Sequence, residues 1–128
     1  SDYLKKTRNI LSSVGNYVYK SLKSNKVLIT PPQGGFYLMP EFLNSKFKTS
    51  AEMCDHILNN FGVALLPGSD FGFDKTRMFA RLSFTDFNGE LFLNNINGSK
   101  KLDDAIIKKY APNVVEGTNR LNKWVQGI

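Results

Sequence analysis

The sequence predicts a two-layer α/β (α+β) domain, in which a small mixed or antiparallel sheet is covered by helices. Helical patterns occur near both ends of the chain, and short apolar runs bounded by Pro and Gly lie between them. With 128 residues, of which 41% are hydrophobic, the chain is long enough to bury a core of its own. We therefore expect residues 1–128 to form a single domain.

The first expected element is a helix from Asp2 to about Ser24, because apolar residues recur there at helical spacing. The residues on its apolar side are Tyr3, Leu4, Ile10, Leu11, Val14, Val18 and Leu22. Asn25 is typical of a helix end, since asparagine tolerates the left-handed conformation. An interior glycine costs a helix about 1 kcal/mol relative to alanine, so Gly15 indicates a close packing contact.

A β-branched run, Val27 to Thr30, predicts a short strand that the two following prolines end. The glycine pair after them predicts a turn. Phe36 to Met39 then reads as the returning strand, which Pro40 stops. On this pattern alone, the segment is a plain hairpin with aromatic packing.

The next helix begins with a capping box, in which Thr49 and Glu52 each satisfy a free backbone amide. Its apolar face consists of Met53, Cys54, Ile57, Leu58 and Phe61, and Gly62 closes it. Cys54 is the only cysteine, which excludes an internal disulfide and a cysteine-based metal site within one chain. We expect Cys54 to be a small buried apolar residue, and His56 to be a surface residue that ligates no metal.

Two apolar runs, Val63 to Leu66 and Met78 to Phe84, predict strands joined by a Pro-Gly and Phe-Gly loop and an exposed turn. The period of two in the second run places Ala80 and Leu82 on one face and Arg81 on the other. An arginine in an apolar strand is costly unless it has a partner. The strand pattern alone leaves a salt bridge and a bound ligand both open.

The last third of the chain predicts mainly helix. The segment Glu90 to Gly98 is expected to be partly helical, and the spacing of Leu102, Ala105, Ile106 and Tyr110 predicts a helix that Pro112 ends. A final amphipathic helix carries Val114, Val115, Leu121, Trp124, Val125 and Ile128.

Two motifs resemble the small domain of class I and II aminotransferases, the fold-type-I enzymes that use pyridoxal 5′-phosphate (PLP). The first is a V-x-x-x-P-G-x-x-F-G loop followed by a strand with an arginine and a serine, matched by Val63, Pro67, Gly68, Phe71, Gly72, Ala80, Arg81, Leu82 and Ser83. The second is P-x-G-G-F-Y, matched by Pro32, Gly34, Gly35, Phe36 and Tyr37. The segment Ala111 to Gly117 is similar to the last helix of several such enzymes.

The resemblance implies a role for each of three residues. Arg81 would bind the α-carboxylate of an amino acid or 2-oxo acid substrate, and Phe36 or Tyr37 would line the substrate cavity. The same resemblance implies that residues 1–25 are the interdomain helix. It also implies that PLP and its Schiff-base lysine belong to a large domain absent from this chain, and that the complete enzyme is a homodimer. The single cysteine favours a reducing compartment, so we expect the enzyme to be cytoplasmic.

The bulk properties of the chain argue against a membrane or nucleic-acid partner. No apolar run reaches the roughly 20 residues that a membrane-spanning helix needs, and the net charge of +6 comes from lysines dispersed along the chain. Because the chain begins at Ser1 in a helical pattern, we expect a segment of a longer polypeptide.

Three alternatives remain open at this point. The chain could be the small domain of a related PLP lyase or synthase, or a non-catalytic binding module with the same fold. The third alternative is a basic nucleic-acid binder, for which steep salt dependence of binding would be the test.

Overall fold

The computed structural model describes residues 2–32, 35–95 and 102–128, and it has the predicted fold class. Five α-helices are present in these ranges: α1 (Asp2–Leu22), α2 (Ser50–Phe61), α3 (Gly89–Asn95), α4 (Asp104–Tyr110) and α5 (Pro112–Gln126). The strands are β1 (Val27–Leu28), β2 (Tyr37–Leu38), β3 (Glu41–Phe42), β4 (Leu66–Pro67) and β5 (Ala80–Ser83). A 3₁₀ turn, η1 (Gly68–Phe71), follows β4 directly.

All strand pairs in the described chain are antiparallel, and they form two small sheets. One sheet has the order β2-β5-β4, with β5 in the middle, and the other pairs β1 with β3. The predicted hairpin between the runs 27–30 and 36–39 is therefore wrong, because β2 pairs with the distant β5 and β1 with β3. Of the two glycines predicted to form its turn, Gly34 lies outside the described residues.

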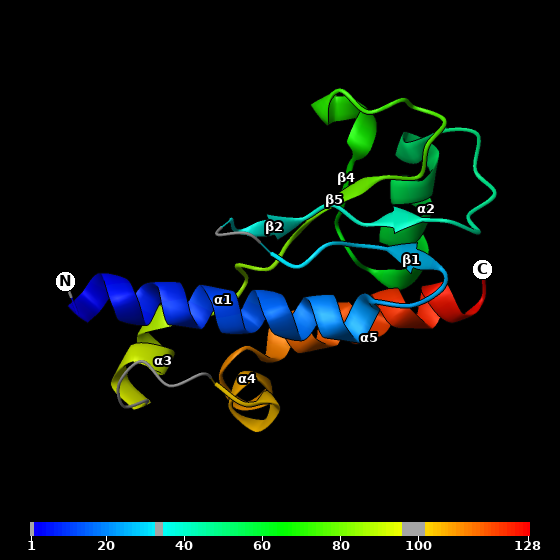
Figure 1. The fold of residues 1–128 in the computed structure, drawn as a ribbon. Helices are drawn as coiled ribbons and strands as arrows, with labels where there is room; N and C mark the ends of the chain where they lie inside the picture. Colours follow the sequence, from blue (N-terminus) through cyan, green and yellow to red (C-terminus); the bar gives the residue numbers. More distant parts are fainter. Residues whose placement is uncertain (1, 33–34, 96–101) are drawn as a thin grey trace.

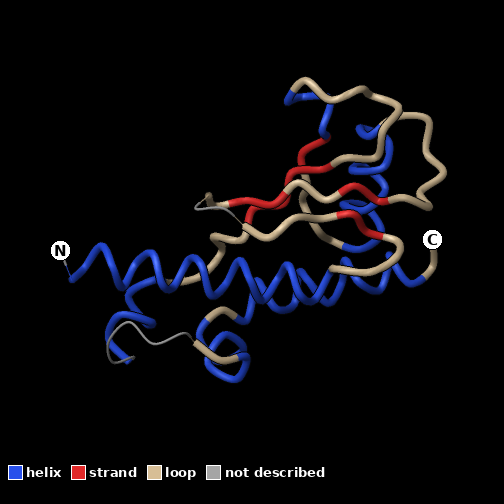
Figure 2. The backbone as a smooth tube through the Cα atoms, viewed as in Figure 1, coloured by secondary structure: helices blue, strands red, loops and turns tan. Residues whose placement is uncertain are grey.

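The helices α1 and α5 run side by side beneath the sheets, and α3 and α4 lie on the other side of α1 (Figure 1). The helix α2 packs against β4, η1 and α5. Figure 2 shows how short the strands are relative to the loops that join them. The strand β5 thus lies in the centre of its sheet, with loops and helices around it.

The core lies between α1, α5 and the inward faces of the strands. It contains Val14 and Val18 of α1, Phe42 of β3 and Leu121 of α5, all almost fully buried. The first two predicted core positions are wrong, because Tyr3 and Leu4 are exposed in the first turn of α1. The N-terminal end of α1 extends beyond the part of the helix that the sheets cover (Figure 1).

The predicted packing contact of Gly15 is confirmed. A Cβ atom added there would lie 2.8 Å from Cζ of Phe84 and 3.1 Å from Cγ of Pro32. The end of α1 differs from the prediction, because Asn25 lies in a turn after the helix and does not adopt positive φ.

The caps of α2 lie at the predicted residues, but of the predicted capping box only the bond to Thr49 is present in the described chain. The amide of Glu52 donates to Oγ1 of Thr49, and Gly62 ends the helix with φ 70° and donates to the carbonyl of Leu58. Pro112 has a second role that the sequence analysis missed, because it is the first residue of α5 as well as the residue after α4. Proline suits this position, since the first amides of a helix have no intrahelical acceptor.

Among residues 2–32, 35–95 and 102–128, no helix combines the length and the apolar character needed to cross a membrane. The part of the 90–98 segment beyond Asn95 lies outside the described residues.

Candidate functional site

Arg81 lies on the face of β5 that points away from the core. The alternation predicted for this strand is confirmed, because Ala80 is fully buried and Leu82 nearly so, whereas Arg81 is half-buried and Ser83 is exposed. Opposite Arg81 in the ladder stands Leu66 of β4. Arg81 thus belongs to the central strand of the sheet, between β2 and β4.

The guanidinium of Arg81 is surrounded by aromatic rings and has no carboxylate partner among the described residues. Its Cζ atom lies 4.5 Å from the ring centroid of Tyr37 and 5.0 Å from that of Phe71. Beside it is a hollow of about 240 Å³, lined by Ala64, Leu65, Leu66, Arg81 and Ser83. An arginine with its N–H donors free at the edge of an apolar hollow is suited to bind an anionic group.

The buried carboxylate of Glu41 is paired with a different arginine, Arg77. Glu41 of β3 is buried, and its two carboxylate oxygens accept hydrogen bonds of 2.8 and 2.7 Å from Nε and Nη2 of Arg77. These bonds, together with the charge of Glu41, raise the pKa of Arg77 above its usual value. The guanidinium of Arg77 also lies over the ring of Phe79 at 4.9 Å.

Sequence reasoning missed the Glu41–Arg77 pair, although a signal was present. Glu41 interrupts an otherwise apolar run in the same way that Arg81 interrupts its strand. A buried carboxylate requires a cation, and Arg77 supplies it. Because both carboxylate oxygens of Glu41 accept hydrogen bonds from Arg77, the N–H donors of Arg81 remain available for a ligand.

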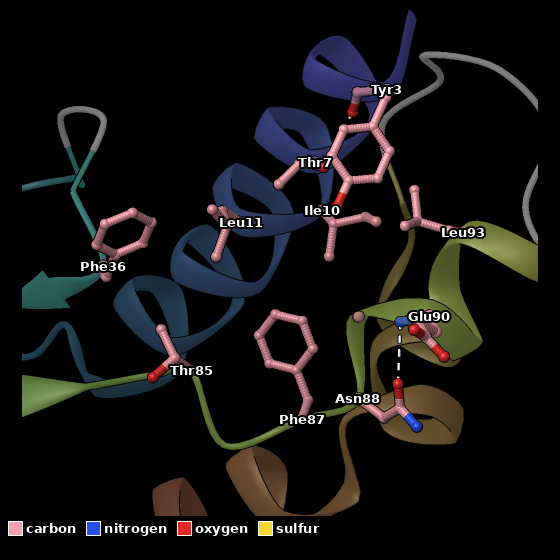
Figure 3. Close-up of a pocket in the computed structure, with 11 residues that line it drawn as sticks. Tyr3, Thr7, Ile10, Leu11, Phe36, Thr85, Phe87, Asn88, Glu90 and Leu93 are labelled. Atoms are coloured by element: carbon pink, nitrogen blue, oxygen red, sulfur yellow. Dashed lines mark hydrogen bonds between the residues drawn. The ribbon is translucent and has the colours of Figure 1, made fainter.

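The two aromatic residues predicted to line a substrate cavity lie in different places. Tyr37 contacts Arg81. Phe36 lines a separate pocket of about 440 Å³, bounded by α1 and the segment that leads into α3. Figure 3 shows its side chain at the start of β2, facing Leu11 of α1, with Phe87 also in the pocket. The lining of this pocket shares no residue with the hollow beside Arg81 among the parts of the chain described.

A model of the aminotransferase class I and II family matches residues 1–113, which is most of the chain. The chain belongs to this family. It is also similar to the alanine aminotransferase from Pyrococcus furiosus, with 25% sequence identity and a TM-score of 0.68. That similarity covers 99% of this chain and 26% of the archaeal enzyme, so the chain spans about a quarter of its length. No curated protein sequence matches the chain.

The P-G-x-x-F-G motif of the chain has a structural explanation. A Cβ atom on Gly68 would lie 2.5 Å from Cβ of Phe79, so only glycine allows η1 to approach β5 this closely. Gly72 has φ 88°, a left-handed conformation that glycine adopts without strain. Pro67 does not break the strand as predicted, because it is the last residue of β4 and pairs with Ala80.

Class I and II aminotransferases generally use PLP, a cofactor that the described residues of this chain do not fit. Apart from Arg81, the hollow is lined by apolar residues and one serine, with no lysine to form a Schiff base. Lys26 donates to backbone carbonyls near the C-terminus, whereas Lys46 and Lys123 line another pocket with His56. The described residues therefore do not assemble a PLP site.

Cys54 and His56 have structural roles. Cys54 is buried as predicted, and burial, aided by the charges of Asp55 and Asp70, raises the pKa of its thiol to about 11. His56 is half-buried rather than fully on the surface, because its ring packs 5.1 Å from that of Phe47. Within the described ranges, no three His, Cys, Asp or Glu side chains are grouped so that they could hold a metal ion.

Proposed function

We propose that this chain, residues 1–128, is the C-terminal small domain of a PLP-dependent aminotransferase, with residues 1–25 as the interdomain helix. In this enzyme, an amino group passes between an amino acid and a 2-oxo acid, and Arg81 binds the α-carboxylate of either substrate. The observation that carries the proposal is the half-buried guanidinium of Arg81, which borders an apolar hollow and lacks a carboxylate partner in the described chain.

Carboxylate binding by Arg81 would affect both affinity and geometry. A planar guanidinium donates two parallel hydrogen bonds to a carboxylate, which fixes the orientation of the bound group. In an α-amino acid, that orientation also sets the direction of the bonds at the reacting carbon. Correct orientation of a bound reactant accounts for a large part of enzymatic rate enhancement.

We assign the rest of the catalytic apparatus to a large domain outside this chain. That domain would supply the Schiff-base lysine and the residues that bind PLP, which carries the amino group in the reaction. Tyr37 is the better candidate of the two predicted aromatic residues, because it contacts Arg81. Phe36 remains a candidate for the edge of the substrate cavity only if the large domain joins its pocket to the hollow.

The family relationship also supports two proposals about the complete enzyme. We expect it to be a homodimer, which light scattering of the purified enzyme would test. We expect it to be cytoplasmic, which fractionation of the source cells would test. We propose no nucleic-acid partner, because the lysines that give the net charge of +6 are dispersed along the chain.

The test of the carboxylate role is the substitution Arg81→Lys in the complete enzyme. A lysine keeps the charge but loses the planar pair of donors. The fall in kcat/KM for the best amino donor should therefore correspond to a loss of about 2 to 5 kcal/mol in transition-state stabilisation. Arg120→Lys is the matched control, because Arg120 forms only an exposed pair with Glu116. An Arg81→Lys enzyme with the kcat/KM of the parent would refute the role.

The same variants separate substrate binding from cofactor binding. Arg81→Ala should leave the visible absorbance of the bound cofactor unchanged, because the residues that bind PLP lie elsewhere in this proposal. Loss of that absorbance in Arg81→Ala, with Arg120→Lys unaffected, would place Arg81 at the cofactor instead.

A further inference from the structure

The contacts of Arg81 come from both elements that flank β5. Tyr37 belongs to β2 on one side, and Phe71 belongs to η1, which follows β4 on the other. Both rings lie within the range at which a cation is attracted to an aromatic face. The guanidinium is therefore held from two directions without a carboxylate among the described residues.

Aromatic contacts suit a guanidinium that has to bind a ligand. A ring attracts the positive charge through its π electrons, but it offers no carboxylate oxygen to accept the N–H donors. A salt bridge, such as the one that Arg77 makes with Glu41, would occupy those donors. The two rings can thus restrict the position of Arg81 and still leave its donors available.

The backbone holds Phe71 in a fixed relation to β5. The amide of Gly68 donates a 2.8 Å hydrogen bond to the carbonyl of Phe79, two residues before Arg81 on the same face of the strand. At the other end of η1, the amide of Phe73 donates to the carbonyl of Gly68. Because a Cβ on Gly68 would collide with Phe79, this close attachment of η1 to β5 depends on the glycine.

We propose that Phe71 and Tyr37 are positioning residues, which together hold the guanidinium of Arg81 in the orientation that receives the substrate carboxylate. This proposal rests on the proposed function, in which Arg81 binds that carboxylate. It assigns Phe71 a role that its place in the loop motif alone does not supply. It also gives Tyr37 a specific task at the substrate cavity, which is contact with the arginine.

The experiment uses the complete enzyme with the substitutions Phe71→Leu and Tyr37→Leu, which remove a ring and keep an apolar side chain. Two substrates are compared: the best amino donor from a panel of the common amino acids, and the amine that lacks only its α-carboxylate. The measured quantity is discrimination, the ratio of kcat/KM for the amino acid to kcat/KM for the amine. We expect each variant to lose about 3- to 10-fold in discrimination, mainly through a higher KM for the amino acid.

Phe73→Leu is the matched control. Phe73 belongs to the same loop and is also partly exposed, but its ring packs on Phe79 at 4.3 Å. This variant should keep the discrimination of the parent enzyme. Phe71→Tyr and Tyr37→Phe retain a ring and should restore discrimination, which separates loss of the aromatic contact from general damage to the loop.

The outcomes distinguish failure of this proposal from failure of the proposed function. If Arg81→Lys loses discrimination but the two leucine variants match Phe73→Leu, the positioning role is refuted and the carboxylate role stands. If Arg81→Lys itself keeps the discrimination of the parent, the carboxylate role is refuted, and the positioning role with it.

Discussion

At the scale of single residues, the two arginines of the β5 region show how burial decides the role of a charge. The Glu41 side chain is 8% exposed and that of Arg77 is 58% exposed, so the carboxylate depends on the pair far more than the guanidinium does. Arg81 is half-buried and has no carboxylate partner among residues 2–32, 35–95 and 102–128. This difference leads to a prediction about stability that does not involve activity.

Arg77→Ala should destabilise the fold more than Glu41→Gln. The first change leaves a buried carboxylate without its cation, whereas the second removes the buried charge and lets the exposed guanidinium of Arg77 be solvated. The double variant should be more stable than Arg77→Ala alone, since it no longer contains the unpaired carboxylate. Urea unfolding of the four proteins measures this, and a double variant no more stable than Arg77→Ala would contradict it.

The buried thiol of Cys54 predicts a specific dependence of stability on pH. Its pKa rises from 9.0 to about 11 in the folded chain. Between these two pH values the thiol is mostly ionised in the unfolded chain but mostly protonated in the folded chain. The free energy of unfolding therefore falls as the pH rises from about 9 to 11. Between pH 8 and 10.5, the parent should lose up to about 2 kcal/mol relative to Cys54→Ala.

Urea unfolding of both proteins at the two pH values checks this prediction. The comparison with Cys54→Ala removes the contributions of lysine and tyrosine, which titrate in the same range in both proteins. If the two proteins lose the same stability between pH 8 and 10.5, the thiol does not titrate as its burial requires.

At the scale of elements, the helices were predictable because their signals are local. Thr49 and Gly62 cap α2 as the sequence indicates, and the spacing of apolar residues gives α1 to within two residues at its end. The apolar runs located β1, β2 and β5, but β4 (Leu66–Pro67) begins only where the run from Val63 ends, and β3 was not predicted. The strand partners were not predicted either. Pairing of β2 with β5 joins residues far apart in the sequence, and no local pattern specifies that contact.

Two glycines in helices provide a matched test of packing. Gly15→Ala in α1 should destabilise the fold by about 1 to 2 kcal/mol, because the added Cβ would lie 2.8 Å from the buried ring of Phe84 and this strain outweighs the better helix propensity of alanine. Gly117→Ala in α5 meets no atom within 4 Å. It should therefore stabilise the fold by up to about 1 kcal/mol.

Thermal unfolding of both glycine variants measures the two effects side by side. We expect the melting temperature to fall in Gly15→Ala and to rise in Gly117→Ala. A Gly15→Ala protein as stable as the parent would mean that Phe84 can move away from α1, against the close packing seen at that contact.

At the scale of the whole molecule, the candidate site combines features that the sequence showed and features that it could not show. The loop motif and the period of two on β5 predicted that Arg81 points away from the core, and this is confirmed. The contact of Arg81 with Phe71 was not predictable, because it depends on how η1 folds back onto β5. Phe36 and Tyr37 are neighbours in an extended segment, where successive side chains point to opposite faces, so Phe36 lines the pocket beside α1 and Tyr37 contacts Arg81.

The surface of the molecule carries exposed apolar side chains that fit its proposed place in a larger enzyme. Several large apolar side chains are exposed, among them Leu66 and Phe71 beside Arg81 and Tyr3 on α1. Exposed apolar surface of this kind is typical of a face that meets another part of a protein. In the proposed enzyme, the large domain would cover the hollow beside Arg81 and enclose the substrate there.

The most direct test of the central claim is an experimental structure of the complete enzyme with a non-reactive substrate analogue that carries an α-carboxylate. The account predicts two hydrogen bonds of about 2.8 Å from the guanidinium of Arg81 to that carboxylate, with the rings of Tyr37 and Phe71 still against the arginine. A carboxylate bound by other residues, with Arg81 taking no part, would contradict the account.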